Sequence, residues 1–264
     1  MKKFLRQYIP PEVLRPYVEC YHELDQTGIS DNDLPMQRCL PNGMAELNFT
    51  LSERPAVGII HGKWNVFPRA YLVGIMREPV LWRMGSKGIL FSARLKPEGI
   101  YTLFGLRPYE CFNGFLDLES ILNPASRDII NRMQETSGSQ ERIRLMDTFL
   151  INQLAVHRKK DLYLEEALRQ LRQAPVSLSI DSVSRHLAIC KRQFERRFKQ
   201  TFGLSPKTYQ RIMRFNKTYE YLEKNPVTRW TELSYTFGYA DQAHFIREFK
   251  HFYGETPALA MKNM

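Results

Sequence analysis

Two short runs of side chains in the last third of the sequence have the types and spacing of helix faces that contact a polyanion. The first run comprises Lys191, Arg192, Glu195, Arg196 and Lys199, and the second comprises Gln242, Ala243, Ile246, Arg247 and Lys250. Steps of three and four residues place each run on one face of a helix. Arginine can bond guanine, glutamine can address adenine, and small apolar side chains can meet thymine methyl groups. The two runs therefore predict surfaces that bind double-stranded DNA.

Each run belongs to a repeated unit. Phe194–Pro206 reads F-E-R-R-F-K-Q-T-F-G-L-S-P, and Phe245–Pro257 reads F-I-R-E-F-K-H-F-Y-G-E-T-P. Aromatic residues recur every four positions in both copies, so they must be buried on the side away from the charged face. A glycine then ends each helix, because glycine tolerates the left-handed backbone found there. A repeat this dense indicates one small helical unit used twice.

The helices that position these faces follow from local signals. Asp161 predicts the start of one helix that Pro175 stops, and Ser177 or Ser179 predicts the start of a second. A third helix is predicted over Lys191–Phe202, after a short break. Two short helices joined by a tight turn, with a basic exposed face on the second, are typical of the helix-turn-helix motif. Its second helix enters the major groove.

A long fourth helix and a second unit follow. Ser205-Pro206 predicts the start of the long helix, with serine as its cap and proline in its first turn. At ~1.5 Å per residue it can hold two reading helices about one turn of DNA apart. Gly238 marks the second turn, and Asp241 is expected to cap a second reading helix over Gln242–Tyr253.

This helix order, ending in G-Y-A-D-Q-A-H-F-I-R-E-F-K-H-F-Y-G-E-T-P, resembles the DNA-binding domain of the AraC/XylS family of bacterial transcription regulators. The resemblance covers residues 161–260 and implies two reading helices in successive major grooves on one face of the duplex. By matching position, it implies base contacts from Arg192, Glu195 and Arg196 in the first unit and from Gln242, Ile246 and Arg247 in the second. RNA polymerase is an expected second partner.

The sequence departs from this family at three positions. Ser184 and Ser234 stand where the supporting helices usually have a small alanine, and Cys190 stands where a serine or threonine usually caps the reading helix. Serine is close to alanine in size, so the fold is expected to be unchanged. The weaker cap is expected to cost up to ~1 kcal/mol locally.

Residues 1–158 have the composition of a different domain. Short segments rich in β-branched and aromatic residues, bounded by glycine, proline and asparagine, predict strands. These segments are Ala45–Leu51, Ala56–Ile60, Arg69–Ile75, Val80–Arg83 and Gly88–Leu95. Helices are predicted over Glu98–Phe104 and Glu141–His157. The expected fold class is α+β: an N-terminal β-barrel, cupin-like domain with C-terminal helices, then an all-α domain with two helix-turn-helix units over residues 159–264.

The phrases C-L-P-N-G-M-A-E-L-N-F and F-S-A-R-L-K-P-E-G resemble, more weakly, the cupin-like sensor halves of one subgroup of this family. The resemblance implies a small effector inside the barrel, dimerisation through helices, or both. Arg94 and Lys96 are candidates for an anionic effector, although such residues more often face solvent or pair with a carboxylate. The apolar stripe of Glu141–His157 offers a homodimer surface or packs on its own barrel, and both alternatives are open. His22 and His61 form no H-x-H pair, so no metal is expected.

Composition bounds the remaining possibilities. The chain has 264 residues and a net charge of +10, which favours polyanion partners. Its first residues lack the apolar core of a signal peptide, and no run approaches the ~18–20 apolar residues of a membrane-spanning helix. The four cysteines, Cys20, Cys39, Cys111 and Cys190, lack C-x-x-C spacing and favour a reducing compartment. A cytoplasmic protein without a cofactor or a membrane partner is expected.

Two rival functions stay open. Some proteins join this kind of DNA-binding domain to a DNA-repair methyl-transfer enzyme with a four-cysteine zinc site, but here no cysteine neighbours another. Nucleophile-elbow and phosphate-loop patterns are absent as well, so no enzyme is expected. The other rival is an architectural protein with little sequence preference, which the mixed second face argues against. The target promoter, the direction of regulation, the effector and the oligomeric state are not encoded in any recognisable pattern.

Overall fold

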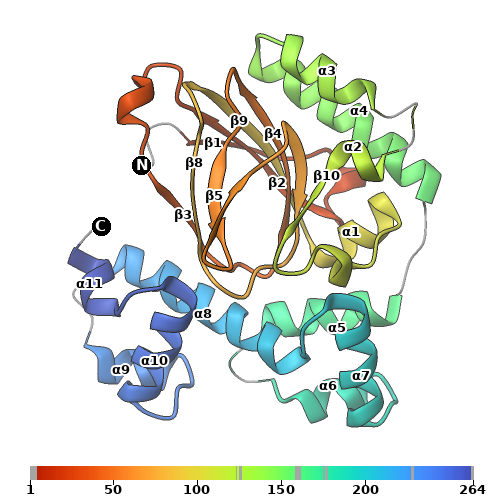
Figure 1. Cartoon of the computed structure of the whole chain (residues 1–264). Helices are drawn as coiled ribbons and strands as arrows, with labels where there is room; N and C mark the ends of the chain where they lie inside the picture. The colour runs from red at the N-terminus through yellow and green to blue at the C-terminus, as the bar shows by residue number, and fades with distance from the viewer. Residues whose placement is uncertain are drawn as a thin grey trace. The chain divides into compact units, whose positions relative to one another are not determined.

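The computed structural model describes residues 5–122, 124, 127–157, 162–174, 176, 178–226 and 229–262. Two compact units divide the chain, one drawn from most of residues 1–160 and the other centred on residues 161–264. The first contains sheets and helices, and the described part of the second contains only helices (Figure 1). The chain is therefore α+β, as predicted. The predicted boundary at residue 158, the helix start at Asp161, the stop at Pro175 and the alternative start at Ser177 lie outside the described residues.

Two antiparallel sheets form the N-terminal unit. The larger has the order β1-β2-β9-β4-β7-β10 and the smaller the order β3-β8-β5-β6. The strands of the larger sheet are β1 (Leu5–Tyr8), β2 (Val18–Asp25), β4 (Ala45–Ser52), β7 (Ala70–Val73), β9 (Gly88–Leu95) and β10 (Phe115–Asp117). The strands of the smaller sheet are β3 (Gln37–Cys39), β5 (Val57–Ile60), β6 (Lys63–Val66) and β8 (Val80–Arg83). All five predicted strands are present, with bounds shifted by two residues at most.

The predicted barrel is wrong. Among the described strands, β1 and β10 form the edges of one sheet and β3 and β6 the edges of the other, so neither sheet closes. The edge strands β3 and β10 have only three residues each, which leaves little backbone for pairing with a further strand. The sheets instead face each other, and Leu24 and Leu90 of the larger sheet pack in one cluster with Trp82 of the smaller.

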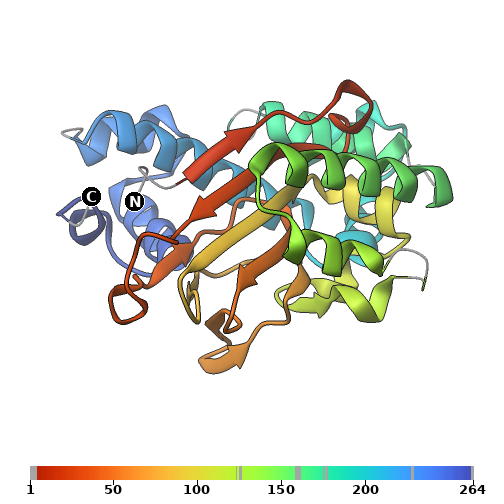
Figure 2. The same cartoon turned by 90° about the horizontal axis from the view of Figure 1, so that it is seen from above.

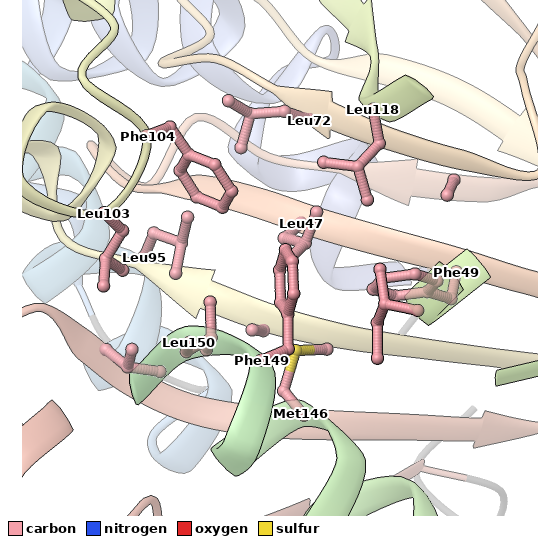
Figure 3. Close-up of a cluster of buried hydrophobic side chains, with 14 of the residues drawn as sticks. Leu47, Phe49, Leu72, Leu95, Leu103, Phe104, Leu118, Met146, Phe149 and Leu150 are labelled. Atoms are coloured by element: carbon pink, nitrogen blue, oxygen red, sulfur yellow. The ribbon is translucent and has the colours of Figure 1, made fainter. Parts of the chain in front are cut away.

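Helices cover the other face of the larger sheet. They are α1 (Pro97–Phe104), α2 (Leu118–Ile121), α3 (Asp128–Glu135) and α4 (Ser139–His157). Helices α3 and α4, drawn in green, lie across the strands in Figure 2. In Figure 3, Met146, Phe149 and Leu150 of α4 gather with Leu47 and Leu95 of the strands, and all are buried in one apolar cluster. The apolar stripe of α4 therefore packs on its own domain, which is the second of the two alternatives that the sequence left open.

The described residues of the C-terminal unit form seven helices. They are α5 (Leu162–Gln173), α6 (Ile180–His186), α7 (Lys191–Phe202), α8 (Pro206–Lys224), α9 (Trp230–Thr236), α10 (Gln242–Tyr253) and α11 (Pro257–Lys262). The bounds of α7 and α10 match the predicted reading helices. Helix α8 runs between the two sets of short helices (Figure 1). Its Tyr209 ring lies 6.0 Å from Phe198 of α7, and its Phe215 ring lies 5.6 Å from Phe249 of α10.

A buried polar cluster fixes α4 to strand β2. The Glu23 carboxylate accepts hydrogen bonds from Arg142 Nε at 3.1 Å and from Ser139 Oγ at 2.7 Å. The side chains of Glu23 and Arg142 are 1% and 4% exposed. One and a half turns further along α4, Asp147 accepts a 2.6 Å hydrogen bond from the Tyr21 hydroxyl. Charges buried this deeply must stay paired, because an uncompensated one destabilises the fold.

Arg142→Ala is therefore expected to destabilise the N-terminal unit by about 3 kcal/mol, since it leaves the Glu23 carboxylate buried beside weaker partners. Hydrogen exchange of the β2 and α4 amides measures this local loss. The control is Arg144→Ala, which removes an exposed arginine from the same helix. Equal exchange rates in the two variants would show that the Glu23 contact does not stabilise the domain.

Candidate nucleic-acid interface

The α6–α7 and α9–α10 pairs repeat one local geometry. Phe194 and Phe198 behind α7, like Phe245 and Phe249 behind α10, have no exposed surface. Both reading helices end at a glycine in the left-handed conformation, with φ of 76° at Gly203 and 94° at Gly254. The phenylalanine side of each helix thus faces inward, as predicted, although Tyr253 at the end of α10 is only half-buried, and the opposite side faces outward.

The predicted DNA-binding residues lie on these outward sides. In the first unit, Lys191, Arg192, Arg196 and Lys199 are exposed and Glu195 is half-buried. In the second unit, Gln242, Ala243, Arg247 and Lys250 are exposed and Ile246 is half-buried. The structure brings each run together on one helix face, and the first face carries more cations than the second. Their contact with DNA stays a prediction.

Two of these side chains are already engaged within the protein. Lys191 Nζ lies 3.3 Å from the Asp181 carboxylate of α6. The amide oxygen of Gln242 accepts a 3.2 Å hydrogen bond from the Thr231 hydroxyl of α9. Sequence reasoning missed both contacts, because they join neighbouring helices whose relative rotation is not encoded in either helix alone.

Helix caps mark where the reading helices begin. Asp241 accepts a 2.6 Å hydrogen bond from the backbone N–H of His244, as predicted for the cap of α10. Cys190 occupies the same position before α7, and its side chain makes no capping hydrogen bond. In the supporting helices, Ser184 and Ser234 are buried and each hydroxyl donates to a backbone carbonyl of its own helix. Serine therefore fits at these positions without leaving a buried donor unpaired.

Glu248 on α10 is the main structural residue that the sequence analysis missed. It is 2% exposed, and its carboxylate accepts hydrogen bonds from Arg211 Nε at 2.7 Å and Arg214 Nη2 at 2.7 Å. Arg214 also donates to the Gly238 carbonyl at 3.0 Å and lies over the Tyr239 ring. These bonds tie α10, the turn before it and α8 into one body. The sequence did carry a signal, because Glu248 stands where the first copy of the repeat has an arginine. Two arginines three residues apart, Arg211 and Arg214, precede it on the long helix.

The equivalent position in the first unit is Arg197, and it acts differently. Its guanidinium is exposed and lies 4.9 Å from the centre of the Tyr163 ring of α5. The Tyr163 hydroxyl donates a 2.8 Å hydrogen bond to the carbonyl of Leu187, at the end of α6. The first reading unit is thus held by a cation–aromatic contact on the surface, whereas the second is held by a buried ion pair.

The effector candidates lie on the inner face of the larger sheet and at its end. Arg94 donates to Glu46 from Nε and Nη2, at 3.2 and 3.1 Å, within a cross-strand row that also contains Cys20. Lys96 donates to the Arg15 carbonyl at 2.7 Å and lies 3.7 Å from a Glu19 oxygen. Both cations have carboxylate partners, which is the alternative that the sequence left open.

A second cross-strand row on this face is also polar and contains His22, Ser92, Asn48 and Tyr71. Burial lowers the pKa of His22 and raises the pKa of the Cys20 thiol, so the 3.2 Å contact between Sγ and Nε2 joins neutral groups. Asn48 Oδ1 is buried without a hydrogen-bond partner among the described residues, and so is Gln37 Nε2 on the facing strand β3.

Neither a metal site nor a membrane span was found in the described part of the chain. No three His, Cys, Asp or Glu side chains there are grouped so as to hold a metal ion. No helix there is long and apolar enough to cross a membrane.

Comparisons with known proteins agree with this geometry. Residues 183–263 match a family described as a helix-turn-helix domain, of the AraC type, and residues 6–117 match a family described as Domain of unknown function (DUF6597). The solved structure of ToxT from Vibrio cholerae has 11% identity and a TM-score of 0.50 over 98% of each chain. An AraC-type regulator from Chromobacterium violaceum has 23% identity and a TM-score of 0.35 over 39% of this chain and 91% of its own. No curated protein matches the chain by sequence.

The helix-turn-helix match over residues 183–263 supports a DNA-binding transcription regulator, and the likeness to ToxT shows a shared fold. Residues 183–263 carry the helix-turn-helix domain, and the chain resembles regulators of the AraC family. The AraC-type regulators that the chain resembles are not enzymes, and residues 6–117 match a domain family of unknown function, so the methyl-transfer alternative is disfavoured.

Glu248→Ala is expected to destabilise the C-terminal unit by about 3 kcal/mol, because it leaves Arg211 and the less exposed Arg214 without their shared carboxylate. Urea unfolding followed by helical circular dichroism measures the loss. The control is Lys250→Ala, which removes an exposed charge from the same helix and should cost less than about 1 kcal/mol. Equal losses in the two variants would show that the buried pair has no special role.

Proposed function

We propose that the chain is a sequence-specific transcription regulator in which α7 and α10 enter successive major grooves on one side of the duplex. The observation that supports this most is the duplicated outward face. Each copy is backed by fully buried phenylalanines and carries arginine, lysine or amide groups at the same helical positions. Such groups form the hydrogen bonds and phosphate contacts that DNA recognition requires.

The connecting helix α8 carries both reading helices. Helix α8 has 19 residues, which corresponds to a length of about 28 Å. Adjacent major grooves on one side of B-DNA are about 34 Å apart. The ring contacts along α8 lie closer together than this, since Tyr209 contacts α7 and Phe215 and Tyr219 contact α10, so the groove spacing also depends on how each reading helix packs on α8. The aromatic contacts of Tyr209 and Phe215 with α7 and α10 hold both helices on this one rod.

The outward faces of α7 and α10 contribute differently to DNA binding. The first face holds Lys191, Arg192, Arg196 and Lys199, so it supplies more of the attraction to phosphate. The second face mixes Gln242, Ala243, Ile246 and Arg247, which suits contacts with base edges and methyl groups. A protein that only bends or coats DNA needs no such mixture, so the second face favours a specific regulator over an architectural protein.

The N-terminal unit is proposed to bind a small polar effector against the inner face of the larger sheet. Buried polar atoms normally have partners, and those of Asn48 and Gln37 have none among the described residues. Arg94 and Glu46 supply charge beside them. Lys96 is a weaker candidate because it contacts Arg15 and Glu19. An effector bound here would bias DNA binding or the contact with RNA polymerase. We also propose that the chain forms a homodimer.

Arg196→Ala is expected to lose about 1–3 kcal/mol of binding to a preferred site and to relax the preference at one base position. Lys199→Ala is expected to weaken binding evenly across sequences and to reduce the salt slope by about one phosphate contact. Selection from a randomised duplex library, then titration at several salt concentrations, measures both effects. Lys63→Ala removes an exposed cation from the N-terminal unit and serves as the charge-matched control. Unchanged selection by the Arg196 variant would contradict the assignment of α7.

Asn48→Leu is expected to stabilise the N-terminal unit by about 1 kcal/mol, because it removes a buried acceptor without a partner. It should also abolish retention of any small molecule that co-purifies with the chain. Thermal unfolding and native mass spectrometry measure the two effects. Asn65→Leu is the matched control, since both amides donate to the carbonyl two residues earlier. Destabilisation by Asn48→Leu, with the ligand mass unchanged, would remove the effector site from this face.

A further inference from the structure

The two helix-turn-helix units share a contact between the start of the reading helix and the supporting helix. Lys191 is the first residue of α7, and Asp181 is the second residue of α6. Gln242 and Thr231 hold the same positions in α10 and α9. Lys191 Nζ lies 3.3 Å from the Asp181 carboxylate, and the Thr231 hydroxyl donates to Gln242 Oε1 at 3.2 Å. The contact recurs with different chemistry, so it belongs to the geometry of the unit.

The contact between Thr231 and Gln242 changes which hydrogen-bonding groups Gln242 can present to DNA. A glutamine amide has one acceptor oxygen and one NH2 donor group. Adenine presents an acceptor and a donor in the major groove, so it needs both ends of the amide, whereas guanine presents two acceptors and needs only donors. Because Oε1 accepts the hydrogen bond from Thr231, the NH2 group is the end of the amide that stays available as a donor.

The contact between Lys191 and Asp181 lowers the positive charge on the outward face of α7. Lys191 and Asp181 are both exposed, at 50% and 60% of their side chains, so the pair lies where it can meet the phosphate backbone. A lysine held by a carboxylate neutralises fewer phosphates than a free one, because the carboxylate competes for the same ammonium group.

We propose that Asp181 and Thr231 are positioning residues for DNA recognition, and that Thr231 makes Gln242 favour guanine over adenine. Asp181 correspondingly holds Lys191 back from the phosphates. Neither supporting residue touches a base. This inference rests on the proposed entry of α7 and α10 into the major groove, because only then do Lys191 and Gln242 face DNA.

Thr231 is tested by selecting bound sequences from a randomised duplex library. Gln242→Ala first identifies the base position that depends on the amide. At that position the wild type is expected to prefer guanine. Thr231→Val keeps the shape but removes the hydroxyl, and should lower the guanine-to-adenine ratio about fivefold or more, the discrimination of a good bidentate contact. Thr231→Ser keeps the hydroxyl and should retain the wild-type ratio. Thr236→Val changes an exposed threonine elsewhere on α9 and should also have no effect.

The outcomes separate this inference from the function it rests on. If the wild type selects no sequence, the proposed function fails and the inference fails with it. If the wild type selects a site but Thr231→Val keeps the wild-type ratio, only the inference is overturned. A selection that Gln242→Ala leaves unchanged at every position also overturns it, because Gln242 then reads no base.

Asp181 is tested by a double-mutant cycle on random-sequence duplex. Asp181→Asn should steepen the salt dependence of binding by up to about 0.9 in log–log slope, because Lys191 becomes free for one phosphate. The same substitution in a Lys191→Ala background should leave the slope unchanged. Equal steepening in both backgrounds would show that the carboxylate acts by general repulsion and does not position Lys191.

Discussion

The geometry of the second reading helix depends on one buried carboxylate. Glu248 is almost fully removed from water, so its charge must be matched by the arginines of α8 or the helix cannot dock. Arg211 and Arg214 approach it from adjacent turns of α8, which fixes both the rotation and the height of α10. Arg214 extends the constraint to the turn through the Gly238 carbonyl. The outward direction of Gln242 and Arg247 follows from this arrangement.

The two helix-turn-helix units have the same arrangement of helices, but different contacts stabilise them. In the first, Arg197 takes the place of Glu248 and lies over the Tyr163 ring, and the stack of Phe194, Phe198 and Phe202 fills the space behind α7. Its turn contains Ala188 at a φ of 52°, where the second unit's turn has a left-handed glycine. A left-handed residue with a side chain costs roughly 1–2 kcal/mol, so the first turn is the more strained. Charge thus fixes the second unit more firmly than the first.

Local signals were enough to predict most of the elements. The aromatic period gave the bounds of α7 and α10, and glycine, proline or asparagine at the ends gave strands β4, β5, β7, β8 and β9. Strands β1 and β2 were missed because their sequence mixes charged and aromatic residues without a clear alternation. The barrel was wrong because closure depends on pairing between distant edges, which no local pattern encodes. Thr231 and Glu248 act across helices, so only the packed structure shows their partners.

The two faces of the larger N-terminal sheet bury different kinds of side chain. The face under α4 is filled by side chains such as Leu47, Phe49 and Met146, which bury apolar surface and need no partners. The face toward the smaller sheet carries polar rows, including Asn48 with an unmatched oxygen. Apolar residues there would make the domain more stable, because unmatched buried polar atoms cost free energy. A scaffold for DNA binding alone has no need of that cost. The polar rows therefore point to a partner for this face whose own polar groups complete its hydrogen bonds.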